Sequence, residues 1–452
     1  MTFDMTPPLP TKQAPLAPGL PVLGNALQLA QATRAFLFEK HLELGPVFRV
    51  RALNQEFVVM AGLEANQFVI RNGRSLFRSR EFWQEMDAEL GAKRSLISMD
   101  GPDHARMRKA QRPGYTRSVI LNQIPEVLAM TRQEIDTWPV DQPLPGHYSL
   151  QRIITEQLGF LAAGYSPRAY LDDMITFVRT LLLTKVTKQR PNLFTYLPTY
   201  RRAKARAFEL AEKVAEAHQM PPEVNGRHPD LIDDLLQLAN EDPDFLPQSD
   251  LMPALLGPFI AGLDTAASTA AFMLYALLRD DDLRASVTAE VDAAWSGELM
   301  PQAVRDLDLL HRTALETLRM YPIAPAITRT VDEPFEFSGY QFAEDTTVLI
   351  ATTVPHYLPE LYPNPNQFDI DRYTAERQEH KPLGAYAPFA VGAHTCLGAG
   401  LAEVQIMLTI GTLLYELDMV MWPPDYQLKI DPAPTPSPDS GFKFRIKRRR
   451  QG

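Results

Sequence analysis

The residues best suited to do chemistry lie in one short segment near the C-terminus, PFAVGAHTCLGAGLAE, which spans residues 388–403. Phe389, Gly392, Cys396 and Gly398 give this segment the spacing F-x-x-G-x-x-x-C-x-G. Glycines let a backbone turn tightly and approach a flat ligand closely. A cysteine just before a helix N-terminus lies at the positive end of the helix dipole, which favours the thiolate. The pattern therefore predicts a thiolate that binds a metal, and the alternative is an inert buried thiol in a glycine-containing loop.

A second candidate lies in the apolar stretch 251–278, whose only charged residue is Asp264. A helix that is apolar nearly all round is central to a large protein or crosses a membrane. Pro258 and Gly262 inside the stretch favour a central helix with a kinked, polar middle. Because an acid in an apolar helix is costly, we expect Asp264 and the adjacent Thr265 to act as an acid–alcohol pair. The alternative is a threonine bonded to its own backbone beside an acid that faces a cavity.

The elements that must position these residues are mostly helical. Helical spacing is found in five further segments, at residues 125–138, 170–185, 201–218, 283–295 and 401–417. A short hairpin is predicted around Asn54-Gln55, and a strand pair over residues 335–350 with turns at 338–339 and 344–345. No internal repeat is evident. These segments predict a chain that is mainly α with a small β region, an α+β class.

Composition narrows the functional classes. The 452 residues carry a formal net charge of -10, which argues against nucleic acid as a partner. Cys396 is the only cysteine, so no disulfide can form within the chain, and a reducing cytoplasm is expected. The N-terminus has no apolar stretch of anchor length, so no transmembrane anchor is expected. The basic run at 447–450 is interpreted as a solvated tail.

The segment around Cys396 and three others in the same order resemble the cytochrome P-450 family over nearly the whole chain. The resemblance implies the cytochrome P-450 fold, with haem b between the long central helix and the cysteine loop. Cys396 would be the axial ligand of the haem iron, and Phe389, Gly392 and Gly398 would line the cofactor. Ala390 stands where the family commonly has a second glycine. The resemblance divides the chain into a proline-rich segment 1–25, a single domain 26–446 and a basic tail 447–452.

Two further motifs match the family. Glu316 and Arg319 form its E-x-x-R motif, and Arg372 in FDIDRY takes the place of a second arginine, although Ile370 replaces a common proline. The resemblance implies a buried charged cluster of these three residues that supports the haem loop. A surface ion pair is the alternative for the E-x-x-R motif alone. Four further residues match positions that bind haem propionates in the family: His104, Arg108, Arg329 and His394.

The segment AGLDT, residues 261–265, matches the oxygen-activation segment of the family. Gly262 is expected to let the helix open beside the iron, while Asp264 and Thr265 deliver protons. The resemblance also suggests the walls of an apolar pocket for a fatty acid, terpenoid, steroid or polyketide. These walls are Phe82, Trp83, Phe177, Phe259, Ala261, Gly262, Ile323, Ala326, Ile327 and Phe442. Core packing is the alternative explanation for the same residues.

The implied activity is that of a monooxygenase that inserts one atom of O2 into a hydrophobic substrate. Electrons would come from NAD(P)H through a separate ferredoxin or flavodoxin-type system. The basic cluster Arg106, Lys109, Arg112 and Arg117 is expected to dock that partner, with a solvated helix face as the alternative. The rival activities are a haem-thiolate peroxygenase or isomerase and a haem-free helical binding protein. A cytoplasmic location is expected, with loose membrane association as the alternative because the proline-rich N-terminus resembles the hinge of membrane-bound relatives.

Overall fold

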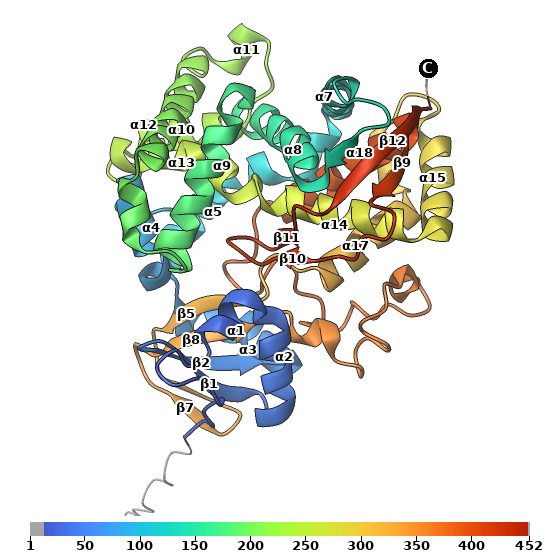
Figure 1. Ribbon diagram of the computed structural model, residues 1–452. Coiled ribbons are helices and arrows are strands. Elements are labelled where there is room, and N and C mark those ends of the chain that lie inside the picture. Colours follow the sequence, from blue (N-terminus) through green and yellow to red (C-terminus); the bar gives the residue numbers. More distant parts are fainter. Residues whose placement is uncertain (1–12, 451–452) are drawn as a thin grey trace, which may run out of the picture.

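The computed structural model describes residues 13–450 and is mainly helical, as predicted. Figure 1 shows most helices in the upper part of the molecule and the largest sheet in the lower part. The longer helices are α2 (Thr33–Leu44), α3 (Leu63–Leu76), α4 (Arg80–Leu90), α5 (Gly101–Gln111), α7 (Ile124–Asp136), α8 (Gly146–Ala163), α9 (Leu171–Leu181), α10 (Pro198–Ala217), α12 (Leu231–Glu241), α13 (Gln248–Gly262), α14 (Thr265–Arg279), α15 (Asp281–Trp295), α17 (Asp308–Met320) and α18 (Ala399–Glu416). The short helices are α1 (Ala26–Gln31), α6 (Arg117–Leu121), α11 (Pro222–Asn225) and α16 (Pro301–Arg305).

The largest sheet has the strand order β1-β2-β8-β5-β3. Its strands are β1 (Val47–Ala52), β2 (Gln55–Ala61), β8 (Thr347–Ala351), β5 (Ile327–Val331) and β3 (Phe77–Arg78). The predicted hairpin around Asn54 is confirmed, because β1 and β2 pair antiparallel from Val47↔Met60 to Ala52↔Gln55.

The prediction of one strand pair over residues 335–350 is only partly right. The first turn joins β6 (Phe335–Phe337) to β7 (Tyr340–Phe342) in a separate hairpin. The third strand of this region, β8, pairs with β2 and β5 instead of with β7. Register with distant strands, which local spacing does not encode, decides this outcome.

Residues 447–449, which were expected to form a solvated basic tail, continue a strand, although Lys447 and Arg448 are exposed. Strand β12 (Lys443–Arg449) pairs with β9 (Leu417–Trp422) and with β4 (Pro143–Pro145), so the chain stays in a sheet until Arg449. Arg449 then donates to the backbone oxygen of Ile135 at 2.9 Å, and Arg450 pairs with Asp292 at 2.7 Å. Acceptors at the end of α7 and on α15 therefore hold cations that the sequence suggested were solvated. The remaining strands, β10 (Ile430–Asp431) and β11 (Ser437–Pro438), form a short ribbon.

The apolar stretch around Asp264 forms the predicted central helix with an interrupted middle. Helix α13 ends at Gly262 and α14 begins at Thr265. Residues 248–279 are apolar and long enough to span a membrane, yet 78% of their most apolar window is buried inside the protein. At the interruption the Thr265 hydroxyl donates to the backbone oxygen of Ala261 at 2.8 Å. Such side-chain bonding competes with the main-chain ladder and bends helices.

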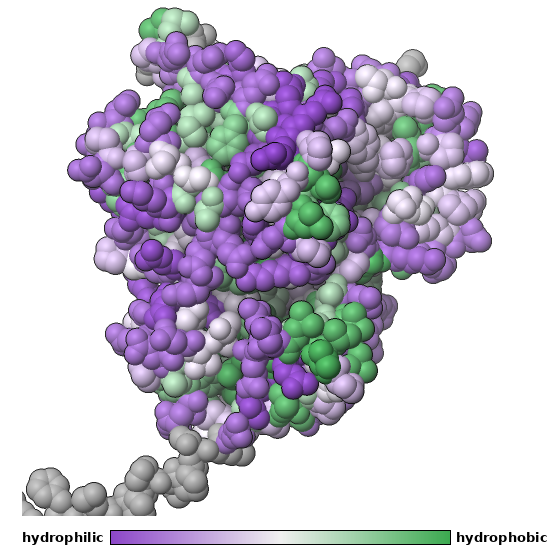
Figure 2. All heavy atoms as spheres, turned by 60° about the vertical axis from the view of Figure 1, so that its left-hand side comes forward, coloured by the Kyte–Doolittle hydropathy of each residue, from purple (hydrophilic) through white to green (hydrophobic). Residues whose placement is uncertain are grey.

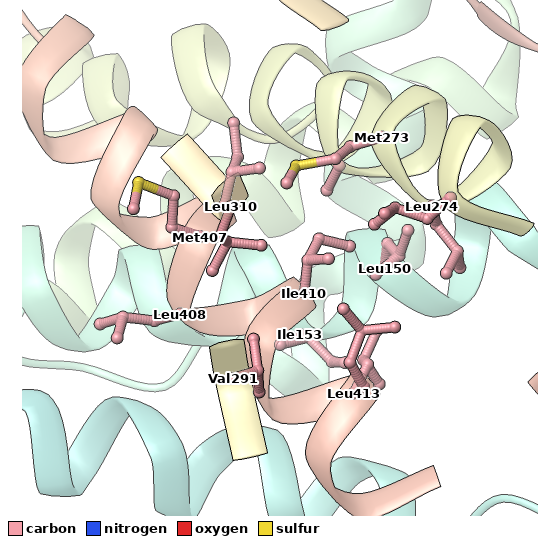
Figure 3. Packing of buried hydrophobic residues seen from close by; sticks show 14 of the residues in the cluster. Leu150, Ile153, Met273, Leu274, Val291, Leu310, Met407, Leu408, Ile410 and Leu413 are labelled. Atoms are coloured by element: carbon pink, nitrogen blue, oxygen red, sulfur yellow. The ribbon is translucent and has the colours of Figure 1, made fainter. Parts of the chain in front are cut away.

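The core that fixes the site lies where α8, α14 and α18 meet. Figure 3 shows Leu150 and Ile153 of α8, Met273 and Leu274 of α14, and Ile410 and Leu413 of α18 packed together. All of these side chains are almost completely buried. The helix that follows Cys396 and the helix that follows Asp264 are thus held in one rigid unit.

Candidate functional site

The loop before α18 presents the sulfur of Cys396 to an open space inside the protein. The cysteine side chain is accessible, yet desolvation by the surrounding protein raises the pKa of its thiol. A side chain that is both accessible and desolvated lines a cavity rather than the outer surface. The backbone N–H groups of Gly398 and Ala399 and the nearby guanidinium of Arg108 act in the opposite direction and lower this pKa. They are placed to stabilise a thiolate once a cation binds it.

The shape of the loop depends on two backbone positions in the left-handed region. Gly392 has φ +82°, and a Cβ there would lie 3.2 Å from the backbone oxygen of Val69. Ala390 has φ 63°, a conformation that favours glycine. The N–H of Cys396 donates to the backbone oxygen of Phe389 at 2.9 Å and closes the loop. The alanine that replaces a common family glycine therefore carries backbone strain.

Two histidines from distant segments stack beside this loop. The ring centroids of His104 and His394 lie 3.9 Å apart with an interplanar angle of 20°. Nε2 of His394 lies 3.1 Å from the carboxylate of Asp100. Desolvation lowers the pKa of His104 to about 4, so this ring is neutral at pH 7. The structure thus brings together the N-terminus of α5 and the cysteine loop.

Two arginines near the loop lack an ion-pair partner within residues 13–450. Arg329 is only 8% exposed, and its guanidinium donates only to the backbone oxygen of Thr328, at 2.7 Å. Burial lowers the pKa of Arg329 to about 10. Desolvation also lowers the pKa of Arg108, whose guanidinium makes no hydrogen bond in the described chain. Arg329 is buried and Arg108 is partly buried. Because desolvated cations without counter-ions are costly, this pair is suited to an anionic ligand.

Behind the loop, Glu316, Arg319 and Arg372 form a fully buried charged cluster. Arg319 donates to both oxygens of Glu316 at 2.8 and 2.7 Å, and Arg372 donates to Oε1 at 3.2 Å. The hydroxyl of Tyr373 adds a bond to Oε2 at 2.8 Å. The exposure of all three charged residues is 0%. Such a cluster is tolerable because its groups are hydrogen-bonded.

A residue that the sequence reasoning missed, His356, links this cluster to the cysteine loop. Its Nδ1 lies 3.1 Å from the backbone oxygen of Arg319, and its Nε2 accepts from the N–H of Ala387 at 2.8 Å. A single histidine outside any motif gave no signal, because its role depends on two backbone groups from separate segments.

Asp264 and Thr265 point in different directions although they are neighbours. Thr265 and Ala261, one turn earlier, both keep accessible surface on the same side of the helix. Asp264 is only 4% exposed and faces α8. One carboxylate oxygen of Asp264 accepts from the amide of Gln151 at 2.5 Å. Desolvation raises the pKa of Asp264, and the nearby charge of Arg179 opposes that rise.

The accessible face of α13 extends away from Thr265 as a stripe that the sequence reasoning also missed. Ala254, Gly257 and Ile260 keep accessible surface along an otherwise buried helix. A Cβ added at Gly257 would meet no atom within 4 Å. Counting backward from Thr265 in helical steps would have found this stripe. Phe82, Trp83, Ile323, Ala326 and Ile327 also keep accessible surface.

Three expected pocket residues do not line this space. Phe177 and Phe259 are 0% exposed and Phe442 is 1% exposed, so no cavity that admits water borders them. Phe177 packs on Tyr200, and Phe442 packs on Tyr275 and Tyr426. Core packing explains these three. Gly262 keeps some accessible surface, but a Cβ there would lie 2.6 Å from the side chain of Leu158 on α8, so its missing side chain leaves room for α8.

The donor set fits haem. An accessible thiol supplies an axial ligand, and two desolvated guanidiniums, Arg108 and Arg329, suit two propionates. At Gly398, φ is -84° and a Cβ would come no closer than 3.6 Å to any protein atom, so neither backbone nor packing requires glycine there. A flat ligand against the loop would explain it.

Comparison with known proteins agrees with this geometry. The family model described as Cytochrome P450 matches residues 14–444. Sterol 14alpha-demethylase of Mycolicibacterium vanbaalenii is 26% identical over 401 residues, which are 85% of this chain and 87% of that protein. Abscisic acid 8'-hydroxylase 4 of Arabidopsis thaliana is 25% identical and covers 96% and 92% of the two chains. Among solved structures, retinoic acid-bound cyanobacterial CYP120A1 has a TM-score of 0.83 at 22% identity and covers 97% and 99%.

Proposed function

Because the chain belongs to the cytochrome P450 family, we propose that it inserts one atom of O2 into a largely hydrocarbon substrate with electrons from a separate redox protein. Membership of the family makes it a haem-thiolate monooxygenase that uses haem and O2. The observation that carries the finer proposal is the accessible face of α13, where Ala254, Gly257, Ala261 and Thr265 follow one another towards the break in the central helix.

Cys396 would hold the haem through its sulfur, with Arg108, Arg329, His104 and His394 at the propionates. When bound, the haem supplies the activation of dioxygen and the oxidising power. The N–H groups of Gly398 and Ala399 donate toward the sulfur and adjust how much electron density it gives. Glu316, Arg319 and Arg372 keep the loop behind the sulfur in place.

In this proposal Thr265 and Asp264 supply protons. The Thr265 hydroxyl, held by the backbone oxygen of Ala261 at 2.8 Å, is on the accessible side of the helix. It can donate a proton to an oxygen atom bound in the cavity and accept one in return. Asp264, buried and with a raised pKa, can hold the replacement proton.

The substrate we propose is an apolar molecule of terpenoid or sterol type. The side chains of Ala254 and Ile260 on the accessible stripe are apolar, and so are the partly accessible Ile323 and Ile327 of another segment. Relatives are named for lanosterol and abscisic acid, and the solved structure is bound to retinoic acid. These molecules are mostly hydrocarbon, which suits such a wall.

The test of the proposal has two parts. In the reduced protein, carbon monoxide should give a strongly red-shifted Soret band, and Cys396→Ala should abolish it. Thr265→Ala should then divert electrons from product to hydrogen peroxide by ten-fold or more, because a proton donor is lost. An unchanged ratio of product to electrons in Thr265→Ala would favour the peroxygenase or isomerase alternative.

Redox-partner docking is supported by unpaired cations around the cysteine loop. Arg106 is engaged with Asp242 at 2.7 Å, and Arg117 with Glu403, so half of the expected basic cluster is occupied. Lys109 and Arg112 are exposed and make no ion pair within the described residues. An open groove of about 570 Å³ beside Ala390 and Gly392 adds Arg71 and Arg74, which are also exposed.

An acidic ferredoxin or flavodoxin would fit this surface. Charge reversal at Arg112, and separately at Arg74, should slow reduction by a plant-type ferredoxin and its reductase several-fold, with a weaker effect in high salt. Reversal of Arg284, which pairs with Asp281 on α15, is the control. Equal rates in all three variants would count against docking here.

For the location we propose the cytoplasm, with a loosely membrane-associated form as the alternative. Figure 2 shows a mostly hydrophilic face with a hydrophobic area on its lower part. Exposed apolar side chains are frequent near the start of the described chain, at Leu20, Val22, Leu27 and Leu53. Co-flotation with anionic vesicles would support the membrane-associated form, and recovery without vesicles would support the cytoplasmic one.

A further inference from the structure

The carboxylate of Asp264 is bonded unevenly. Its Oδ1 accepts a hydrogen bond from the amide of Gln151 at 2.5 Å, whereas its Oδ2 is buried without a partner among residues 13–450. A buried carboxylate oxygen without a partner costs free energy and is rare in native proteins. It lies at the break between α13 and α14, next to Thr265. An unbonded oxygen at that position is free to carry a proton.

Gln151 reaches Asp264 from a different helix. It lies on α8 and is 2% exposed, and its amide makes the one hydrogen bond to this carboxylate within the described chain. A hydrogen bond to a carboxylate favours the charged form and also fixes the rotation of the side chain. The amide of Gln151 therefore decides which of the two oxygens is free.

Charged groups extend from Asp264 toward the surface. Arg179 on α9 and Asp431 on β10 both act electrostatically on Asp264. Arg179 donates to the backbone oxygen of Ala433 at 3.1 Å and lies 3.5 Å from the carboxylate of Asp431, whose side chain is 47% exposed. On α8, His147 faces Ser268 instead, at 3.1 Å. The acid is thus connected to the surface through a guanidinium and then a solvated carboxylate, and Thr265 is its neighbour in the chain.

On the basis of the proposed function, we propose that Gln151 is the positioning residue of the acid–alcohol pair. It holds Oδ1 of Asp264 so that Oδ2 is the atom that passes protons from the Arg179–Asp431 side to Thr265. In each transfer Oδ2 takes one proton that originates in solvent and releases one proton to the Thr265 oxygen. Because the two side chains point in different directions, this second proton passes through intervening water. Thr265 then gives up its own proton to an oxygen atom bound in the cavity. The carboxylate returns to its starting state, so no charge accumulates.

A purely structural role for Gln151 is the competing explanation, and α8 offers a matched control. Gln157 is 0% exposed on the same helix, but its amide bonds to Thr131 at 2.9 Å and its oxygen accepts from Gln405 and Thr409. Replacement of either glutamine by methionine, which has nearly the same shape, removes a buried amide from α8. Only one of the two replacements touches Asp264.

The decisive measurement is the protonation of Asp264, read by infrared difference spectroscopy against Asp264→Asn in the resting protein. Gln151→Met should raise the midpoint of this carboxyl by about one pH unit or more, because the charged form loses its donor. Gln157→Met should leave the midpoint unchanged. Equal midpoints in Gln151→Met and Gln157→Met would overturn the proposal.

Two further variants are needed. The first keeps the proposal testable if Gln151→Met does not fold, and the second tests the Arg179–Asp431 pair, the outer arm of the proton path. Gln151→Asn shortens the amide by one methylene without adding volume and should raise the midpoint as Gln151→Met does. Arg179→Gln, at a side chain that is 33% exposed, should also raise it because a nearby cation is lost. If Gln151→Asn leaves the midpoint of the Asp264 carboxyl unchanged, Gln151 is not the positioning residue. If Arg179→Gln leaves it unchanged, the Arg179–Asp431 pair is not part of the proton path.

The loaded enzyme gives a separate readout. The fraction of electrons recovered in product should fall in Gln151→Met but not in Gln157→Met, and Gln151→Met should cause no further loss in an Asp264→Asn background. The carboxyl titration does not depend on turnover. A protein that titrates as expected but does not oxygenate would therefore sink the proposed function and leave the positioning role standing.

Discussion

The N–H of Ala387 donates to Nε2 of His356 at 2.8 Å, while Nδ1 of the same ring lies 3.1 Å from the backbone oxygen of Arg319. One ring nitrogen thus accepts and the other donates, which fixes a neutral tautomer. The ring is completely buried, and burial lowers the pKa of His356 to about 3. A neutral imidazole therefore connects the buried charged cluster to the start of the cysteine loop.

From this arrangement we expect His356 to make stability fall in acid. Between pH 6.5 and 3 the unfolded chain binds a proton at this residue and the folded chain does not. The free energy of unfolding should therefore decrease as the pH falls, by up to about 1.4 kcal/mol per pH unit from this group. Urea unfolding at pH 7, 6 and 5 measures this slope.

His356→Leu should remove that part of the slope and destabilise the protein at pH 7 by about 2–4 kcal/mol, because two backbone groups lose their partner. The exposed His228 supplies the control, and His228→Gln should keep the slope. A slope that His356→Leu leaves intact would show that other groups cause the acid sensitivity.

Glu316 is the ion-pair partner of the buried Arg319 and shares Arg372 with Glu379, so Glu316→Gln should destabilise the protein by about 3–5 kcal/mol. The surface pair of Arg284 and Asp281 is the comparison, and Asp281→Asn should cost about 0–1 kcal/mol. Both free energies of unfolding can be measured by urea titration of the haem-free protein. Similar losses in the two variants would contradict the role of Glu316 in the cluster.

Ala390 adopts a positive φ of 63°, so Ala390→Gly should relieve strain and stabilise the protein by about 0.5–1 kcal/mol. Ala393 lies in the same loop but is not among the residues with positive φ. Ala393→Gly should therefore destabilise it slightly. Thermal unfolding of both variants beside the parent protein tests the pair, and a lower melting temperature for Ala390→Gly would be the contrary result.

Gly257 and Gly262 lie on α13 but should respond oppositely to alanine. Gly262→Ala should destabilise the protein by about 1–3 kcal/mol, since its methyl would meet Leu158 at 2.6 Å. Leu158→Ala in the same chain should recover part of the loss. Gly257→Ala meets no atom within 4 Å, so it should keep or gain stability while it weakens binding of bulky apolar ligands. Unfolding curves and ligand titrations distinguish the two.

Arg329 should matter to the cofactor more than to the fold. Arg329→Met removes a buried cation without an ion-pair partner in residues 13–450, so the haem-free protein should be as stable as before or more stable. Haem transfer to apomyoglobin should be at least ten-fold faster, because a propionate partner is lost. The same change at the exposed Arg80 is the control. Unchanged haem retention would contradict the propionate role.

The features of the site that depend on local spacing could be predicted from the sequence. The spacing of residues 389–398 predicted the loop around Cys396, and Pro258 and Gly262 within residues 251–278 predicted the interrupted central helix. Helix segments were found within a few residues of their observed ends, because amphipathic spacing is a local property.

Other features depend on which segments meet in space. The sequence places Phe177, Phe259 and Phe442 in apolar surroundings, but it does not say whether core or cavity lies beside them. Likewise, the role of Gln151 depends on the contact of α8 with the break in the central helix, and that of His356 on two distant backbone groups. A glycine such as Gly262 is ambiguous until the opposing Leu158 is known.

Strand β12 is made after both of the strands with which it pairs. Strand β12 closes the sheet with β9 and β4, and Arg449 reaches back to the end of α7. The helix that follows the cysteine loop can therefore form during synthesis before residues 443–449 complete the sheet beside it. A chain that lacked these residues would leave the edges of β9 and β4 open to other chains.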